Sequence, residues 1–259
     1  MPSLPLHMAV GQEFRHAEFY IQTAEETGRD EVGGGVYNAL SEQYRKIGVS
    51  YLLLDGNLDD YAHSLITSAI TRRALLRRGL PEEPDHAYRA SFLDPFHDAV
   101  AVGQIELAAE IGRLSPAEWY EDFEYEEDFL YAQILFGLVD PGTRPLETLV
   151  EQHEKALRGV DDSRNGVCRA LIAREPIAFV DAFDDFIRQV VDEIAEARVS
   201  SYQFYDFQEV SVEGLALLRL AEHAGLPTER EYRHCPSWAR RTDYAPYVPE
   251  SFPNVPLHG

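Results

Sequence analysis

Aromatic and acidic side chains alternate in one short segment, residues 119–129, which reads WYEDFEYEEDF. Aromatic rings supply rigid contact area at interfaces, and clustered carboxylates can take the positions that phosphates occupy in a basic cleft. The segment therefore predicts a surface that binds a cationic partner, such as a nuclease or another enzyme with a basic cleft. The same pattern is also typical of the start of a helix, with Trp119, Phe123 and Phe129 in the core and the acids in solvent.

A second group of carboxylates lies on one face of a predicted helix over residues 176–199. On a helical wheel, Phe179, Phe183 and Phe186 fall on one side, and acidic side chains fall on the opposite side. We expect the partner-binding residues to come from these two groups: Trp119, Tyr120, Glu121, Asp122, Glu124, Tyr125, Glu126, Glu127, Asp181 and Asp185.

Signals for catalysis are weak in this sequence. There is no Gly-x-Ser-x-Gly motif, and Cys168 and Cys235 lie in no recognised catalytic motif. The glycine run at residues 33–35 lacks the Gly-Lys-Ser/Thr ending of a phosphate-binding loop. The nearest approach to the Glu-x-x-His pattern of a di-iron bundle is Asp94 with His97. We therefore expect no catalytic residue, no metal site and no cofactor, and a protein that is not an enzyme.

The chain is strongly acidic, because 45 Asp and Glu against 23 Lys and Arg give a formal charge of −22 at pH 7. Nucleic-acid binding relies on Lys and Arg displacing condensed counterions, so we expect no direct binding of nucleic acid. The densest basic cluster falls at the end of a predicted helix, where it complements the helix dipole; it comprises Arg72, Arg73, Arg77 and Arg78. The acidity itself is explained either by solubility or by electrostatic steering toward a basic partner.

Cysteine usage and hydropathy predict a cytoplasmic protein. The two cysteines show no metal-ligand spacing, so reduced thiols are expected. The first ten residues lack a basic stretch followed by an apolar run, and no part of the chain approaches the roughly 18 consecutive apolar residues of a membrane span. We expect neither export nor a membrane partner.

Helical periodicity recurs through most of the chain, whereas alternating strand patterns are scarce. The sequence predicts an all-α fold, either an antiparallel helical bundle or a helical array, with a Pro-rich, extended C-terminal arm. Besides residues 176–199, start and stop signals predict helices over residues 14–27, 36–54, 58–78, 95–102, 105–111, 126–138, 146–157, 166–173 and 211–225. Ser115, followed by Pro116 and Glu118, predicts a further helix start.

We expect residues 1–226 to form a single helical domain, which divides, if at all, into sub-units 1–80 and 91–226. Short connections place the first three predicted helices side by side. Beyond residue 226, six prolines exclude helix, while tyrosines and Trp238 favour contact with a folded surface. Residues 227–259 are therefore expected to form an extended arm packed on the helices, or an arm that becomes ordered on binding.

The stretch 211–227 (SVEGLALLRLAEHAGLP), followed by Cys235 and Pro236, resembles the closing helix of the Imm49-type immunity proteins of bacterial polymorphic toxin systems. Earlier stretches fit the same pattern in the same order, namely residues 97–114, 127–140 and 171–190. The resemblance covers roughly the last two thirds of the chain and consists mainly of helix-packing patterns.

This resemblance implies a cytoplasmic antidote that binds and neutralises a cognate toxin domain, and it implies no catalytic residues. If the toxin acts on nucleic acid, its cleft is basic, and long-range attraction draws an acidic inhibitor toward it. The acidity then serves steering as well as solubility. The alternatives are a metal-dependent or modification-reversing helical enzyme and a helical adaptor unrelated to toxins.

Overall fold

The computed structural model describes residues 6–28, 31–83, 85–200, 206–228 and 230–241. Over these residues the fold is all-α, with ten α-helices and no strand, which confirms the fold class expected from the periodicity. Three short 3₁₀ helices accompany them, η1 (His86–Tyr88), η2 (Asp206–Glu209) and η3 (Ser237–Arg240).

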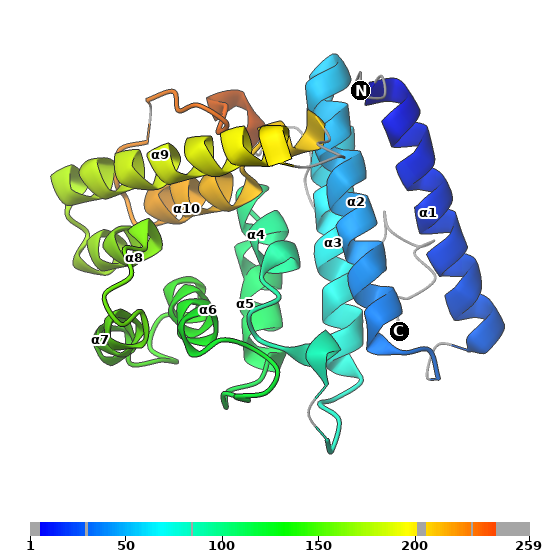
Figure 1. The fold of residues 1–259 in the computed structure, drawn as a ribbon, viewed down its shortest axis with the longest axis horizontal. Coiled ribbons are helices and arrows are strands. Elements are labelled where there is room, and N and C mark those ends of the chain that lie inside the picture. The colour runs from blue at the N-terminus through cyan, green and yellow to red at the C-terminus, as the bar shows by residue number, and fades with distance from the viewer. Residues whose placement is uncertain (1–5, 29–30, 84, 201–205, 229, 242–259) are drawn as a thin grey trace.

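The first three helices are long and pack side by side, with α2 between α1 and α3 (Figure 1). They are α1 (Leu6–Thr27), α2 (Gly34–Asp55) and α3 (Leu58–Arg77). The tight turn from α2 to α3 depends on Gly56, which adopts a left-handed conformation with φ of 65°. Asn57 then caps α3, because its side chain accepts a hydrogen bond from the backbone N–H of Asp60 at 3.2 Å.

The remaining helices continue from this layer, and α4 and α5 both pack against α3 (Figure 1). Their bounds are α4 (Asp94–Ala101), α5 (Ile105–Leu114), α6 (Glu126–Val139), α7 (Leu146–Ala156), α8 (Ser163–Ala173), α9 (Pro176–Ser200) and α10 (Val212–His223). Helix α10 lies against α4 and is apolar on most sides, as expected for a central helix. Its predicted N-cap is confirmed, since Ser211 Oγ accepts from Gly214 N at 3.0 Å.

The buried hydrophobic side chains form one continuous core that runs from Ala17 in α1 to Ala239 in η3. Close packing at Gly214 illustrates its density, because a Cβ at that position would lie 2.5 Å from the sulfur of Cys235. The described part of the predicted arm joins this core through Tyr232, whose ring meets that of Phe183 at 4.7 Å between centroids. Residues 242–259 of that arm lie outside the described residues.

The helix start predicted at Ser115 is wrong. Ser115 Oγ donates to the carbonyl of Ile111 at 2.9 Å and so closes α5, and the next helix begins only at Glu126. The carbonyl of Pro116 is bound instead by the side chain of Gln133 in α6, at 3.0 Å. A local capping pattern is therefore outweighed by hydrogen bonds to a neighbouring helix.

The arginines near the end of α3 bind neighbouring segments, which corrects the expectation that they serve mainly the helix dipole. Arg72 is buried and donates to the carbonyls of Ala87 and Arg89. Arg77 lies 2.6 Å from Glu110 of α5, and Arg73 also pairs with that carboxylate. Arg78 donates to the carbonyl of Val32 at 2.7 Å. These side chains therefore join α3 to the segments packed around it.

Candidate functional site

The acidic and aromatic segment between α5 and α6 adopts an irregular but well-bonded turn over residues 116–125. Trp119 Nε1 donates to the carbonyl of Glu124 at 3.0 Å, and Phe123 N donates to the carbonyl of Tyr120 at 2.9 Å. These bonds fold the segment back on itself. The backbone therefore holds its side chains in fixed directions even though no helix supports them.

Most of the predicted partner-binding residues in this segment face solvent. Tyr125 is 74% exposed and Trp119 is 37% exposed. Glu121 and Asp122 are exposed as well, and Tyr120 is half-buried. Trp and Tyr are among the residue types enriched at the anchor positions of protein interfaces.

Glu124 differs from these neighbours because it is only 9% exposed. Its Oε2 accepts a hydrogen bond from the backbone N–H of Ser91 at 2.8 Å, which ties the segment to the link between η1 and α4. Phe129 is buried as well, and Phe123 is half-buried against the ring of His86, at 4.7 Å between centroids. The segment thus combines core packing with a solvent-facing acidic edge.

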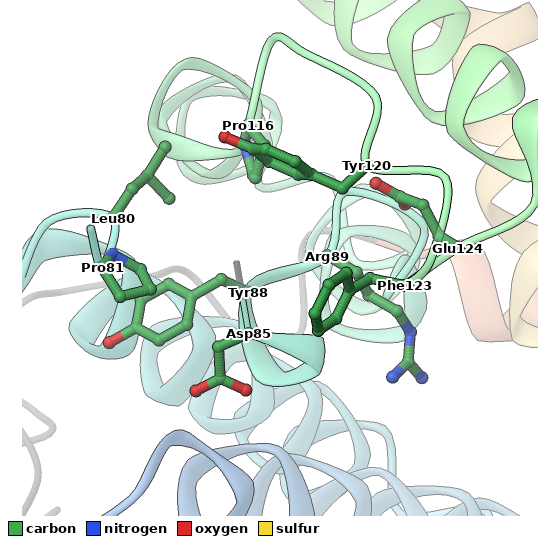
Figure 2. Close-up of a pocket in the computed structure, with 9 residues that line it drawn as sticks. All are labelled: Leu80, Pro81, Asp85, Tyr88, Arg89, Pro116, Tyr120, Phe123 and Glu124. Atoms are coloured by element: carbon green, nitrogen blue, oxygen red, sulfur yellow. The ribbon is translucent and has the colours of Figure 1, made fainter. Parts of the chain in front are cut away.

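A small pocket lies between this segment and the link that follows α3 (Figure 2). The rings of Tyr88, Tyr120 and Phe123 border it, together with the side chains of Asp85 and Glu124. Its volume is about 20 Å³, and a cavity of that size holds roughly one water-sized group. The pocket is therefore suited to a single small chemical group.

Glu126 and Glu127 lie half-buried in the first turn of α6, beside Asp128. Acids in that position complement the positive end of the helix dipole, which is a structural reason for their presence. Asp128 also lies 3.4 Å from Nη2 of Arg164, and the same guanidinium binds Asp162 at 2.7 Å. The start of α6 is thereby linked to the start of α8.

Asp181 and Asp185 are exposed on α9, as the helical wheel predicts. Asp185 forms an ion pair with Arg188 and lines a cleft of about 530 Å³ between the start of α8 and α9, whereas Asp181 does not line it. We call this the acidic cleft, and its carboxylates are Asp161, Asp162, Asp185, Asp192, Glu193 and Glu196. Since Arg188 is the one basic residue in the described lining, the acidic cleft is strongly negative.

The structure does not bring the two predicted groups together. Among the described hydrogen bonds, ion pairs and ring contacts, none joins residues 119–125 to Asp181 or Asp185. The connection between α6 and the acidic cleft runs through Arg164 and Asp162. The described contacts therefore give no direct link between residues 119–125 and the two aspartates of α9.

A buried charged centre between α2, α3 and α4 was not predicted from the sequence. Arg45 Nε donates to Asp98 at 2.7 Å, Ser68 Oγ donates to the same carboxylate at 2.6 Å, and Arg45 also pairs with Asp94. Burial raises the pKa of Asp98 to about 6, even though Arg45 and Ser68 oppose the change. No local motif marks this centre, because its members lie on separate helices.

His97 lies next to the same centre and is fully buried. Burial, reinforced by the charge of Arg45, lowers the pKa of His97 to about 3, so the ring is neutral at ordinary pH. A pocket of about 310 Å³ adjoins the centre and is lined in part by Glu42, Arg45 and Asp94.

Among the described side chains, no group of three His, Cys, Asp or Glu residues is placed to hold a metal ion. No helix in the described part of the chain is long and apolar enough to cross a bilayer. In comparisons with known proteins, the chain matches no family model, no curated protein and no solved structure.

Proposed function

We propose that this protein is a bacterial immunity protein that binds a cognate toxin in the cytoplasm and blocks its active site or the access of its substrate. The observation that carries the proposal is the acidic cleft, where two carboxylates that directly precede α8 and four from α9 lie around a single arginine. A negatively charged surface is complementary to a basic catalytic cleft, and such complementarity governs the specificity and the rate of association.

The size of the acidic cleft suits a protein partner that inserts side chains or a loop. Its volume of about 530 Å³ falls within the roughly 300–1,000 Å³ range of pockets that bury a small molecule, so it has room for a few inserted side chains. The carboxylates on α9 are held by a helix whose opposite face packs into the core through Phe179, Phe183 and Phe186. A rigid support of this kind reduces the ordering cost of binding.

The overall charge and the resemblance support the same proposal. A formal charge of −22 attracts a basic partner over long range, and such steering raises association rates by about 10- to 1,000-fold. The stretch that resembles the closing helix of Imm49-type immunity proteins corresponds to α10.

Co-expression with the product of the adjacent gene tests this proposal. We expect a stable complex of fixed stoichiometry, protection of cells from that toxin, and an association rate that falls steeply between low and physiological salt. Failure to form a complex would overturn the proposal. An association rate that does not change with salt concentration would contradict the electrostatic steering in this proposal.

A charge-reversal experiment tests the acidic cleft itself. The triple variant Asp185→Lys, Asp192→Lys and Glu193→Lys is expected to lower the association rate at least about tenfold. The matched control places the same charge change on α1, on the other side of the molecule, through Glu18→Lys, Glu25→Lys and Glu26→Lys (Figure 1). An equal loss in both variants would show that net charge alone matters.

A second candidate function is an enzyme that reverses a toxin's modification at the charged centre around Arg45. It is favoured by the pocket of about 310 Å³ beside Arg45 and by the pKa of Glu42, which burial raises. Perturbed carboxyl groups beside a pocket are typical of functional sites. Neutralisation at far less than one equivalent of protein per toxin would favour the enzyme, and a requirement for full equivalence would favour the inhibitor.

A further inference from the structure

The small pocket between η1 and the acidic and aromatic segment combines aromatic rings with a buried carboxylate. Figure 2 shows the rings of Tyr88, Tyr120 and Phe123 on different sides of the space, with Asp85 and Glu124 at its border. The face of an aromatic ring carries partial negative charge and attracts a cation. Rings and carboxylates therefore favour the same kind of ligand.

One oxygen of Glu124 has no hydrogen-bond partner within the described structure. Its Oε2 accepts from Ser91 N at 2.8 Å, whereas Oε1 is buried and unpaired. A buried carboxylate oxygen without a donor is unfavourable, and the side chain that carries it lines the pocket. The carbonyl of Glu124 is fixed by Trp119 Nε1 at 3.0 Å, which holds the residue in place.

The one basic side chain in the described lining of this pocket, Arg89, does not fill the space between the rings. Its guanidinium lies over the ring of Phe92, 5.4 Å from the centroid, and donates to the carbonyl of His86. In Figure 2 it points away from the centre of the pocket. The space between the rings is therefore open to a cation from outside the molecule.

We propose that this pocket binds one alkyl-ammonium group, the end of a lysine side chain on a partner protein. The volume of about 20 Å³ fits a compact ammonium, which is smaller than the planar fork of an arginine. Leu80, Pro81 and Pro116 line the same pocket and offer apolar contact to the methylene stem. The proposal deepens the proposed function, since it names how a basic partner is anchored.

The affinity of the pocket is measured on the whole protein, without the toxin, by two-dimensional NMR titration with n-butylammonium. We expect saturable shifts at the backbone amides of Ser91, Tyr120 and Phe123. The neutral analogue n-butanol is expected to bind at least tenfold more weakly, because it lacks the charge. Equal affinity for both compounds, or no saturable shift with either, would overturn the proposal.

The variant Glu124→Gln identifies the carboxylate as the recognition group. Glutamine keeps the size of the side chain and an oxygen that can accept from Ser91 N, so the fold is retained while the charge is lost. We expect at least a tenfold loss of n-butylammonium affinity, against no change in Glu118→Gln, which alters an exposed acid of the same segment. Unchanged affinity of Glu124→Gln for n-butylammonium would show that the carboxylate does not recognise the ammonium group, and would overturn the proposal.

A second variant, Phe123→Leu, removes a ring from the pocket while keeping an apolar side chain of similar size, and it is expected to weaken n-butylammonium binding by several fold. Unchanged binding in this variant would overturn the role of the rings. The outcomes separate this site from the proposed function. If the protein binds n-butylammonium but not the adjacent gene product, the ammonium site is supported and the toxin-binding function is overturned. If the protein binds the adjacent gene product but not n-butylammonium, the toxin-binding function is supported and the ammonium site is overturned.

Discussion

The buried charged centre and the outer face of α9 contain the same kind of ion pair in opposite surroundings. Arg45 meets Asp98 where that carboxylate is fully buried, whereas Arg188 and Asp185 meet in solvent. Removing one partner of a buried pair leaves an uncompensated charge, while exposed pairs contribute little to stability. The first pair fixes the packing of α2 on α4, and the second leaves its charge available to a binding partner.

The acidic and aromatic segment lies between these extremes. Glu124 is buried and holds the backbone of Ser91, while Glu121 and Asp122 face solvent in the same turn. Three acids within four residues thus have different roles. Burial, rather than residue type, separates the carboxylate that also maintains the fold from those that lie entirely in solvent.

The largest expected effect follows from Asp98→Ala, which removes the fully buried carboxylate that binds both Arg45 and Ser68. We expect the free energy of unfolding to fall by about 3–5 kcal/mol, measured by urea denaturation. Ser68→Ala, which removes one hydrogen bond to the same carboxylate, should cost less. A loss below about 1 kcal/mol in Asp98→Ala would contradict a stabilising role for the buried pair.

Glu124→Ala is expected to lower the free energy of unfolding by about 1–3 kcal/mol, because the N–H of Ser91 loses its acceptor. Glu121→Ala serves as the control in the same turn, and its exposed side chain predicts almost no change. Equal stability of the two variants would remove the distinction between buried and exposed acids in this segment.

Stability is expected to depend on pH through His97. Its pKa falls from 6.5 to about 3 on folding, so the unfolded chain binds more protons between these values and acidification destabilises the protein. Asp98 acts in the opposite direction, because its raised pKa favours the folded state as the pH falls through about 6.

The variant His97→Phe isolates the histidine from Asp98. Relative to the wild type, it should lose about 1–2 kcal/mol less stability between pH 6.5 and pH 5, since that window lies above the folded pKa and below the unfolded one. Thermal unfolding across this range measures the difference. Parallel profiles for the two proteins would show that the pKa of His97 is the same in the folded and unfolded chains, and would contradict the lowered pKa.

The smallest effect is expected for Asp185→Ala on α9. Its pair with Arg188 is exposed, so the free energy of unfolding should change by less than about 0.5 kcal/mol. The same variant is nevertheless expected to slow association with a basic partner. A large loss of stability would show that the outer face of α9 maintains the fold.

The helices themselves were largely predictable from the sequence, because their signals are local. Pro176 begins α9 and Ser211 caps α10 as expected, and the buried phenylalanines of α9 follow the predicted face. The prediction failed at Ser115, where the hydroxyl closes the preceding helix. The site was only partly predictable, since exposure of Glu121 and Asp185 follows from the pattern but burial of Glu124 does not.

By itself, the sequence determined the all-α class, most helix bounds and the negative charge. Periodicity and caps involve residues that are close together in the sequence, and net charge does not depend on the fold at all. Only the tertiary structure decided which carboxylates are buried, paired or gathered in a cleft. Glu124 meets Ser91, Arg45 meets Asp98, and Ser163 meets Gln189 of α9 across long stretches of chain. Such contacts depend on how the helices pack, and packing joins residues that no local pattern relates.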